Sequence, residues 1–104
     1  MHKPGDIVLT TIQFTDTYEV KKRPALVLWS EFDNTVVAGI TSNKEMKGIA
    51  LTKKDGAIKD SVIKLNYIFT IADSLIIKKL FSLNANKRKE IHKEMLNKIS
   101  SFSS

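Results

Sequence analysis

A proline stands between a run of cations and a run of apolar residues, and this junction restricts the backbone more than any other feature of the chain. Lys21, Lys22 and Arg23 come first, and Pro24 then opens an apolar run over residues 25–29. Because proline lacks a backbone N–H and has a fixed φ, it belongs at a strand start or on a sheet edge. Its ring also pushes the preceding residue toward an extended backbone. The junction therefore predicts a buried strand with Arg23 held at its mouth.

Short segments rich in β-branched and aromatic residues recur along the chain, separated by polar turn residues. Apolar residues in this pattern are typical of strands. Residues 74–81 fit either a strand or a short helix, and both alternatives stay open. We expect strands over residues 7–14, 24–30, 35–40, 49–51, 61–65 and 67–71, with a bend at Asn66 between the last two.

The end of the chain has a different periodicity. Ile91, Met95, Ile99 and Phe102 recur at helical spacing, with mostly charged and polar residues between them. Such a stripe predicts an amphipathic helix packed on the sheet. Asn84 is a candidate N-cap, because its side chain can accept a hydrogen bond from the first turn. The predicted fold class is mainly β with a C-terminal helix.

The second and third predicted strands are joined only by the turn cluster of residues 31–34. Sequential strands with so short a connection usually pair as an antiparallel hairpin. A turn centred on Asp33, or just before it, brings Arg23 opposite Thr41 or Ser42. A slip of one residue exchanges these two partners, so the sequence leaves both pairings open.

Composition limits the kind of protein. The 104 residues predict a single domain over residues 1–104, with a formal net charge of +6 and no cysteine. A small basic domain favours a polyanionic partner, RNA or DNA first. The lack of cysteine excludes disulfides and thiolate metal sites. No apolar run approaches the length of a membrane span, and the N-terminus lacks the apolar segment of a signal peptide. We therefore expect a cytoplasmic protein without a membrane segment.

Several site classes have no counterpart in the sequence. His2 and His92 have no acidic or cysteine partners at ligand spacing, and no zinc or EF-hand pattern occurs. No dinucleotide-binding, Walker or nucleophile-elbow motif occurs among the four glycines. Catalysis would therefore depend on arginine, lysine, threonine, serine and carboxylates, with no metal and no cofactor expected.

Seven segments follow one another in a recognisable order and spacing. They are GDIVL at residues 5–9, FTD at 14–16, KRPALVL at 22–28, VVAGITS at 36–42, SVIKL at 61–65, IFTI at 68–71 and KKL at 78–80. Together with the final helix they resemble the MazF/PemK family of toxin endoribonucleases, which belong to type II toxin–antitoxin systems. The resemblance covers nearly the whole chain.

The resemblance implies a fold, an activity and partners. The fold is an SH3-like β-barrel of the CcdB/MazF type with a C-terminal helix, usually as a homodimer. Family members cut single-stranded RNA at short sequences without a metal. The 2′-OH attacks the adjacent phosphate to give a 2′,3′-cyclic phosphate and a 5′-OH, and the loss of mRNA stops translation and growth. The implied partners are single-stranded RNA, a cognate acidic antitoxin and a second copy of the chain.

The resemblance also implies a site. The family's catalytic arginine matches Arg23 and its catalytic threonine matches Thr41, the positions that the hairpin brings together. A guanidinium can clamp the phosphoryl oxygens as charge builds on them, and a threonine can orient the 2′-OH or relay a proton. The general base stays unassigned. The residues expected to bind RNA are Glu19, Lys21, Lys22, Ser42 and Tyr67.

The chain departs from the family pattern after Leu65. Tyr67 and Phe69 replace the family's polar glutamine and arginine. These rings either stack on unpaired bases or belong to the core, and the departure bears on the cleavage sequence more than on the reaction. Two other functions stay open for a barrel of this fold. One is a toxin that binds DNA gyrase through its C-terminal helix without RNA chemistry, and the other is an inactive RNA-binding barrel.

Overall fold

The computed structural model describes residues 2–13, 20–43 and 45–104. Within these residues it contains six strands, one α-helix and three short 3₁₀-helices. The strands are β1 (Asp6–Gln13), β2 (Val20–Glu31), β3 (Asn34–Thr41), β4 (Ile49–Leu51), β5 (Ser61–Ala72) and β6 (Ile76–Ser82). The helices are α1 (Ala85–Ile99) and the 3₁₀-helices η1 (Lys53–Asp55), η2 (Asp73–Leu75) and η3 (Ser100–Ser103).

The predicted strands are present, with two adjustments. The segments over residues 61–65 and 67–71 form the single strand β5, and the ambiguous segment over residues 74–81 becomes η2 followed by β6. Phe14, the predicted end of the first strand, lies outside the described residues. All the paired strands run antiparallel in one sheet with the order β4-β5-β3-β2-β1-β6.

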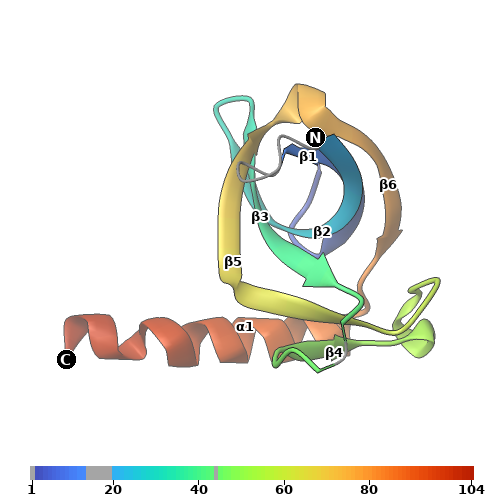
Figure 1. Cartoon of the computed structure of the whole chain (residues 1–104). Coiled ribbons are helices and arrows are strands. Elements are labelled where there is room, and N and C mark those ends of the chain that lie inside the picture. The colour runs from blue at the N-terminus through green and yellow to red at the C-terminus, as the bar shows by residue number, and fades with distance from the viewer. Residues whose placement is uncertain (1, 14–19, 44) are drawn as a thin grey trace.

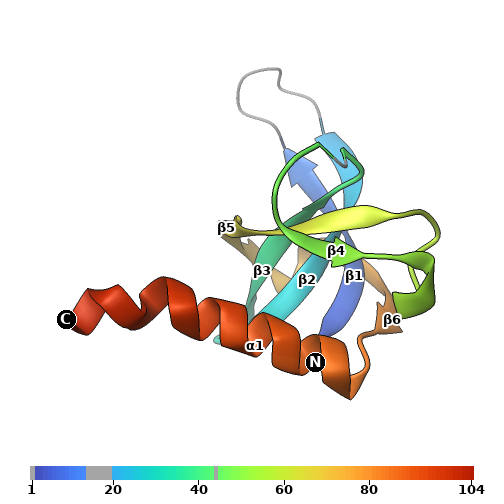
Figure 2. The same cartoon turned by 90° about the horizontal axis from the view of Figure 1, so that it is seen from below.

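The sheet curls strongly, so that β1, β2, β3, β5 and β6 surround a common interior in Figure 1. The helix α1 lies outside this ring, below it in Figure 1, and crosses the strands in the view from below (Figure 2). The expected mainly β, SH3-like barrel with a C-terminal helix is therefore confirmed.

The β2–β3 hairpin turns through two residues, since Glu31 pairs with Asn34. Phe32 and Asp33 have φ values of 53° and 63°, the positive φ at both positions that a type I′ turn requires. Further along, the pairing shifts by one residue, because Leu28 is an extra residue on β2 between the pairs formed by its two neighbours. This β-bulge sets the register of the rest of the hairpin.

β5 changes partner and direction at its middle. Ala38 of β3 pairs with Ile68, but the next residue, Gly39, pairs with Lys64, so residues 65–67 have no counterpart on β3. The first half of β5 also pairs with β4, while the second half pairs only with β3. The bend predicted at Asn66 is thus confirmed as a wide irregularity within one strand.

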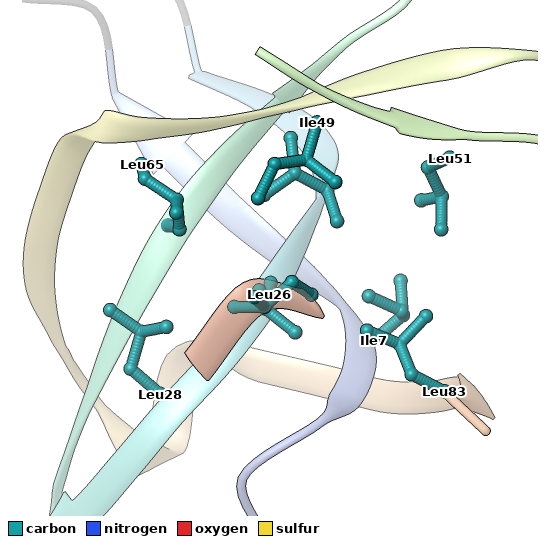
Figure 3. Packing of buried hydrophobic residues seen from close by; sticks show 10 residues of the cluster. Ile7, Leu26, Leu28, Ile49, Leu51, Leu65 and Leu83 are labelled. Atoms are coloured by element: carbon teal, nitrogen blue, oxygen red, sulfur yellow. The ribbon is translucent and has the colours of Figure 1, made fainter. Parts of the chain in front are cut away.

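Two apolar clusters lie on opposite faces of the sheet, because neighbouring residues of a strand point to opposite sides. The barrel interior holds the smaller cluster of Val8, Ala25, Val27, Val37 and Ile71. Alternating residues of the same strands pack on the other face against β4 and α1 (Figure 3). Burial on both faces explains why the run over residues 25–28 is continuously apolar.

The N-cap of α1 is confirmed, since Lys87 N donates to Asn84 Oδ1 at 2.8 Å. The predicted apolar stripe packs only along its first half. Ile91 is buried, but Ile99 is 63% exposed and Phe102, just beyond the helix, is 95% exposed. The expectation that the whole stripe packs on the sheet is therefore wrong within one chain, because the helix extends past the edge of the barrel (Figure 2).

Candidate active site

A groove of about 610 Å³ opens where the beginning of β2, the end of β3 and the bend of β5 meet. It is lined by side chains from these strands and from the loops that follow β3 and precede β5. The residues expected at the site that line it are Arg23, Thr41, Lys22, Ser42 and Tyr67. The structure thus brings the two expected catalytic residues into one groove with three of the expected RNA-binding residues.

Arg23 and Thr41 each lie two residues beyond the last pair between β2 and β3. Ala25 pairs with Gly39. Among the described residues, no pair between β2 and β3 is formed beyond this one, so neither Thr41 nor Ser42 pairs directly with Arg23, and both alternatives stay open. All three residues line the same groove.

Arg23 lies inside β2 and not at the strand's mouth as expected, because the strand already begins at Val20. On its other side it pairs with Thr10 of β1. Thr10 is fully buried, and its hydroxyl donates to the carbonyl oxygen of Leu75 at 2.9 Å. The Arg23 side chain is exposed and makes no hydrogen bond or ion pair with the residues that the structure describes. The strand therefore holds the backbone of Arg23 in place, and the guanidinium is available to a ligand.

Thr41 is the last residue of β3 and is half-buried. Its Oγ1 accepts a hydrogen bond from the backbone N–H of Asn43 at 3.1 Å. A hydroxyl that accepts one hydrogen bond keeps its own proton for another partner. Thr41 can therefore donate to a ligand in the groove while the following loop fixes its oxygen.

The charged side chains that line the groove in the described part of the chain are all of one sign. Four cations line it, Lys22, Arg23, Lys59 and Lys64, and no carboxylate belongs to its lining among the described residues. A cleft with one sign of charge and low-dielectric walls concentrates ions of the opposite sign. The groove is therefore suited to a chain of phosphodiesters, which fits the basic composition of the protein.

Lys64 is a groove residue that the sequence reasoning missed. It is only 8% exposed, and its ammonium donates to the carbonyl oxygen of Lys47. The ammonium also lies 5.3 Å from the centre of the Tyr67 ring, within the range of a cation–π contact. The available signal was a single lysine within the otherwise apolar segment of residues 62–65.

The remaining expected residues are placed differently. Lys21 lies on β2 opposite Ile12 of β1 and does not line the groove. Glu19 lies outside the described residues. Phe69 lines the groove but also packs against the interior cluster, whereas the Tyr67 side chain is 49% exposed. Of the two aromatic departures from the family pattern, Phe69 is thus a core residue at the groove wall and Tyr67 is accessible.

Comparison with known families identifies the chain. The sequence model of the PemK-like, MazF-like toxins of type II toxin–antitoxin systems matches residues 3–99, nearly its full length. The chain belongs to this family. A comparison with curated proteins gives no match. Membership of the PemK/MazF family agrees with the barrel and the C-terminal helix, and it makes the chain a toxin of the type II toxin–antitoxin class.

Two further observations concern this PemK/MazF-type toxin as a whole. No helix in the described part of the chain is long and apolar enough to cross a membrane. No group of three or more histidine, cysteine, aspartate or glutamate side chains is placed to hold a metal ion among residues 2–13, 20–43 and 45–104.

Proposed function

We propose that this toxin is a sequence-specific endoribonuclease that cuts single-stranded RNA in the groove of Arg23 and Thr41. The observation that carries the proposal is that these two side chains line one groove, in which the charged residues that the structure describes are all positive. The 2′-OH of the RNA attacks the adjacent phosphorus, and the bond from phosphorus to the 5′-oxygen breaks. The products are a 2′,3′-cyclic phosphate and a 5′-OH, and no metal takes part.

Arg23 and Thr41 take different roles in this reaction. Arg23 donates two parallel hydrogen bonds to the phosphoryl oxygens, on which negative charge grows as the phosphorane forms. A preorganised donor of this kind contributes about 3–4 kcal/mol to transition-state stabilisation. Thr41 orients the attacking 2′-OH or relays its proton. The guanidinium does not serve as the base, because it does not lose its proton in a protein.

The cationic lining supports RNA as the substrate. Lys22 and Ser42 contact the RNA backbone on either side of the cleaved bond, and Lys21 attracts the strand from outside the groove. Tyr67 presents a ring on which an unpaired base stacks, as in other single-strand binders. Glu19 completes the expected RNA-binding set.

The same groove accounts for neutralisation. An acidic segment of a cognate antitoxin would occupy it in place of RNA, because both are polyanions. We further propose a cytoplasmic homodimer, for which the exposed apolar end of the C-terminal helix, with Leu96, Ile99 and Phe102, is a candidate contact.

The deciding experiment incubates the purified toxin with a pool of single-stranded RNA in EDTA and sequences the new 5′ ends. Cuts at a short recurrent motif, with 5′-OH and cyclic phosphate termini, are expected. Activity that disappears with EDTA and returns with magnesium would refute the mechanism. Inhibition of DNA gyrase without any RNA cleavage would instead support the gyrase-binding hypothesis, and RNA binding without cleavage would indicate an inactive barrel.

A further inference from the structure

Lys64 is placed in a way that the proposed reaction does not explain. A buried ammonium is costly unless charge partners and hydrogen bonds compensate it. Within the described part of the chain Lys64 has no ion pair, and its partners are the Lys47 carbonyl oxygen and the face of Tyr67. An ammonium has three donors, so the contacts seen leave capacity for a further acceptor.

Strand pairing locates Lys64 relative to the catalytic pair. Lys64 pairs with Gly39 of β3, and Thr41 pairs with Val62, two residues away on β5. Paired residues share a face of the sheet, so Lys64 lies on the same face as Thr41. Two residues along a strand span about 7 Å, which is comparable to the step from one phosphate to the next in a nucleic acid strand.

Gly39 lets Tyr67 of β5 approach the backbone of β3 closely. A Cβ built at this position would lie 3.4 Å from the Cβ of Tyr67 and 3.9 Å from the Phe69 ring. The backbone and Cβ of Tyr67 therefore lie directly over Gly39, which fixes the root of the Tyr67 side chain beside Lys64. The arrangement combines a cation with an accessible ring.

We propose that Lys64 and Tyr67 form a subsite for the nucleotide next to the cleaved phosphodiester, an inference that rests on the proposed RNA cleavage. The Lys64 ammonium contacts the phosphate of that nucleotide, and the Tyr67 ring stacks on its base. Every base has a stacking face, so this subsite tolerates different bases at its position. It accounts for the aromatic replacement of the family's glutamine at Tyr67.

Two substitutions separate the roles. Binding is measured with a random-sequence single-stranded DNA oligonucleotide, which lacks the attacking 2′-OH and stays intact. Lys64→Met should weaken binding several-fold and reduce the steepness of the log–log salt dependence by about 0.7, the loss of one phosphate contact. Tyr67→Ala should weaken binding by about 10-fold or more without changing the salt dependence, and Tyr67→Phe should bind like the wild type.

The control is Lys78→Met, which removes an exposed lysine from β6 on a strand that does not line the groove. It should retain both the affinity and the salt dependence of the wild type, because salt largely screens a charge that lies outside the groove. Lys64→Met should also keep its melting temperature, since an apolar side chain of similar length replaces a buried cation.

The outcomes distinguish the subsite from the reaction on which it rests. A wild type that does not cleave RNA refutes the proposed function. A wild type that cleaves, together with a folded Lys64→Met protein whose salt dependence is unchanged, refutes the subsite and makes Lys64 a tether of the loop that carries Lys47. A Tyr67→Ala protein that binds like the wild type refutes the stacking role.

Discussion

At the scale of single residues, Arg23 is the sharpest test of the proposed reaction. Its side chain is exposed and its neighbours pack through Ala25 and beyond, so Arg23→Ala should fold with an unchanged melting temperature. Single-turnover cleavage should fall by about 10²–10³, the usual loss of one transition-state donor. Arg23→Lys should restore only part of it, because an ammonium lacks two parallel donors. Full activity in a folded Arg23→Ala protein would move the site elsewhere.

Thr41→Ala should lower the same rate, by less than Arg23→Ala, because water can replace an orienting hydroxyl. Both residues are proposed to act on one phosphate. The double substitution should therefore cost less than the product of the two single losses. If the two single losses in cleavage rate multiply in the double variant, the two residues do not act on the same phosphate.

Asp6 gives a residue-scale prediction on stability. Burial alone would raise the pKa of its carboxyl, but hydrogen bonds from Lys3 N and Ser82 Oγ, with Lys79 and His2 nearby, outweigh this effect and hold the pKa below its usual value. A lowered folded-state pKa contributes stability above the unfolded-state pKa, and the contribution disappears as the pH falls through the folded value.

Asp6→Asn should therefore lower the free energy of unfolding by about 1–2 kcal/mol at neutral pH, because it removes a charged hydrogen-bond acceptor. The difference from the wild type should shrink as the pH falls through the lowered pKa of Asp6. Urea unfolding at neutral and acidic pH measures it. An equal difference at both would show that the charge of Asp6 is not involved.

At the scale of elements, the β2–β3 turn contains one residue that is poorly suited to its backbone. Phe32 and Asp33 both have positive φ, which aspartate tolerates but which costs a residue such as phenylalanine about 1 kcal/mol or more. Phe32→Asn combined with Asp33→Gly should raise the free energy of unfolding by about 1–2 kcal/mol, seen as a higher urea midpoint at constant m. Cleavage should not change, because Arg23 lies at the opposite end of the hairpin.

Phe32→Ala is the control for the turn. The Phe32 side chain is 88% exposed, so its removal costs no packing, but alanine has no preference for positive φ. This variant should not be stabilised. An equal gain from both variants would mean that the exposed ring, and not the backbone conformation, was the unfavourable feature.

At the scale of the whole molecule, the net charge of +6 and the cationic groove predict salt-dependent binding of single-stranded RNA. Two to four phosphate contacts give a log–log slope between about −1.4 and −2.8. A titration of an RNA with a 2′-O-methyl group at the cleaved position measures it. If the affinity does not change with salt, the net positive charge of the protein has no role in RNA recognition.

The exposed end of the C-terminal helix predicts the oligomeric state. Ile99→Ser with Phe102→Ser should convert the proposed homodimer into a folded monomer, because these side chains, 63% and 95% exposed, have no cover within one chain. Sedimentation measures the mass. Ile58→Ser, at 89% exposure elsewhere on the surface, is the control and should leave the dimer intact. A wild-type monomer, or a dimer that survives the double substitution, would exclude this contact.

The sequence by itself determined the elements of this protein. Alternating β-branched residues placed the strands, helical spacing placed α1, and Asn84 marked its first turn, because each of these patterns is local. The family motifs identified Arg23 and Thr41 as the candidate catalytic pair. Local patterns of this kind do not depend on which strand lies beside which.

Only the tertiary structure decided how neighbouring strands are aligned with one another. Counted from the turn, Gly39 would lie opposite Leu26; the extra residue Leu28 shifts the pairing so that Gly39 lies opposite Ala25. Likewise, the bend of β5 brings Lys64 and Tyr67 together beside Gly39. Registers and bulges depend on packing both faces of the curled sheet at once, and a shift of one residue reverses the face of every side chain beyond it. No local stretch of sequence contains that information.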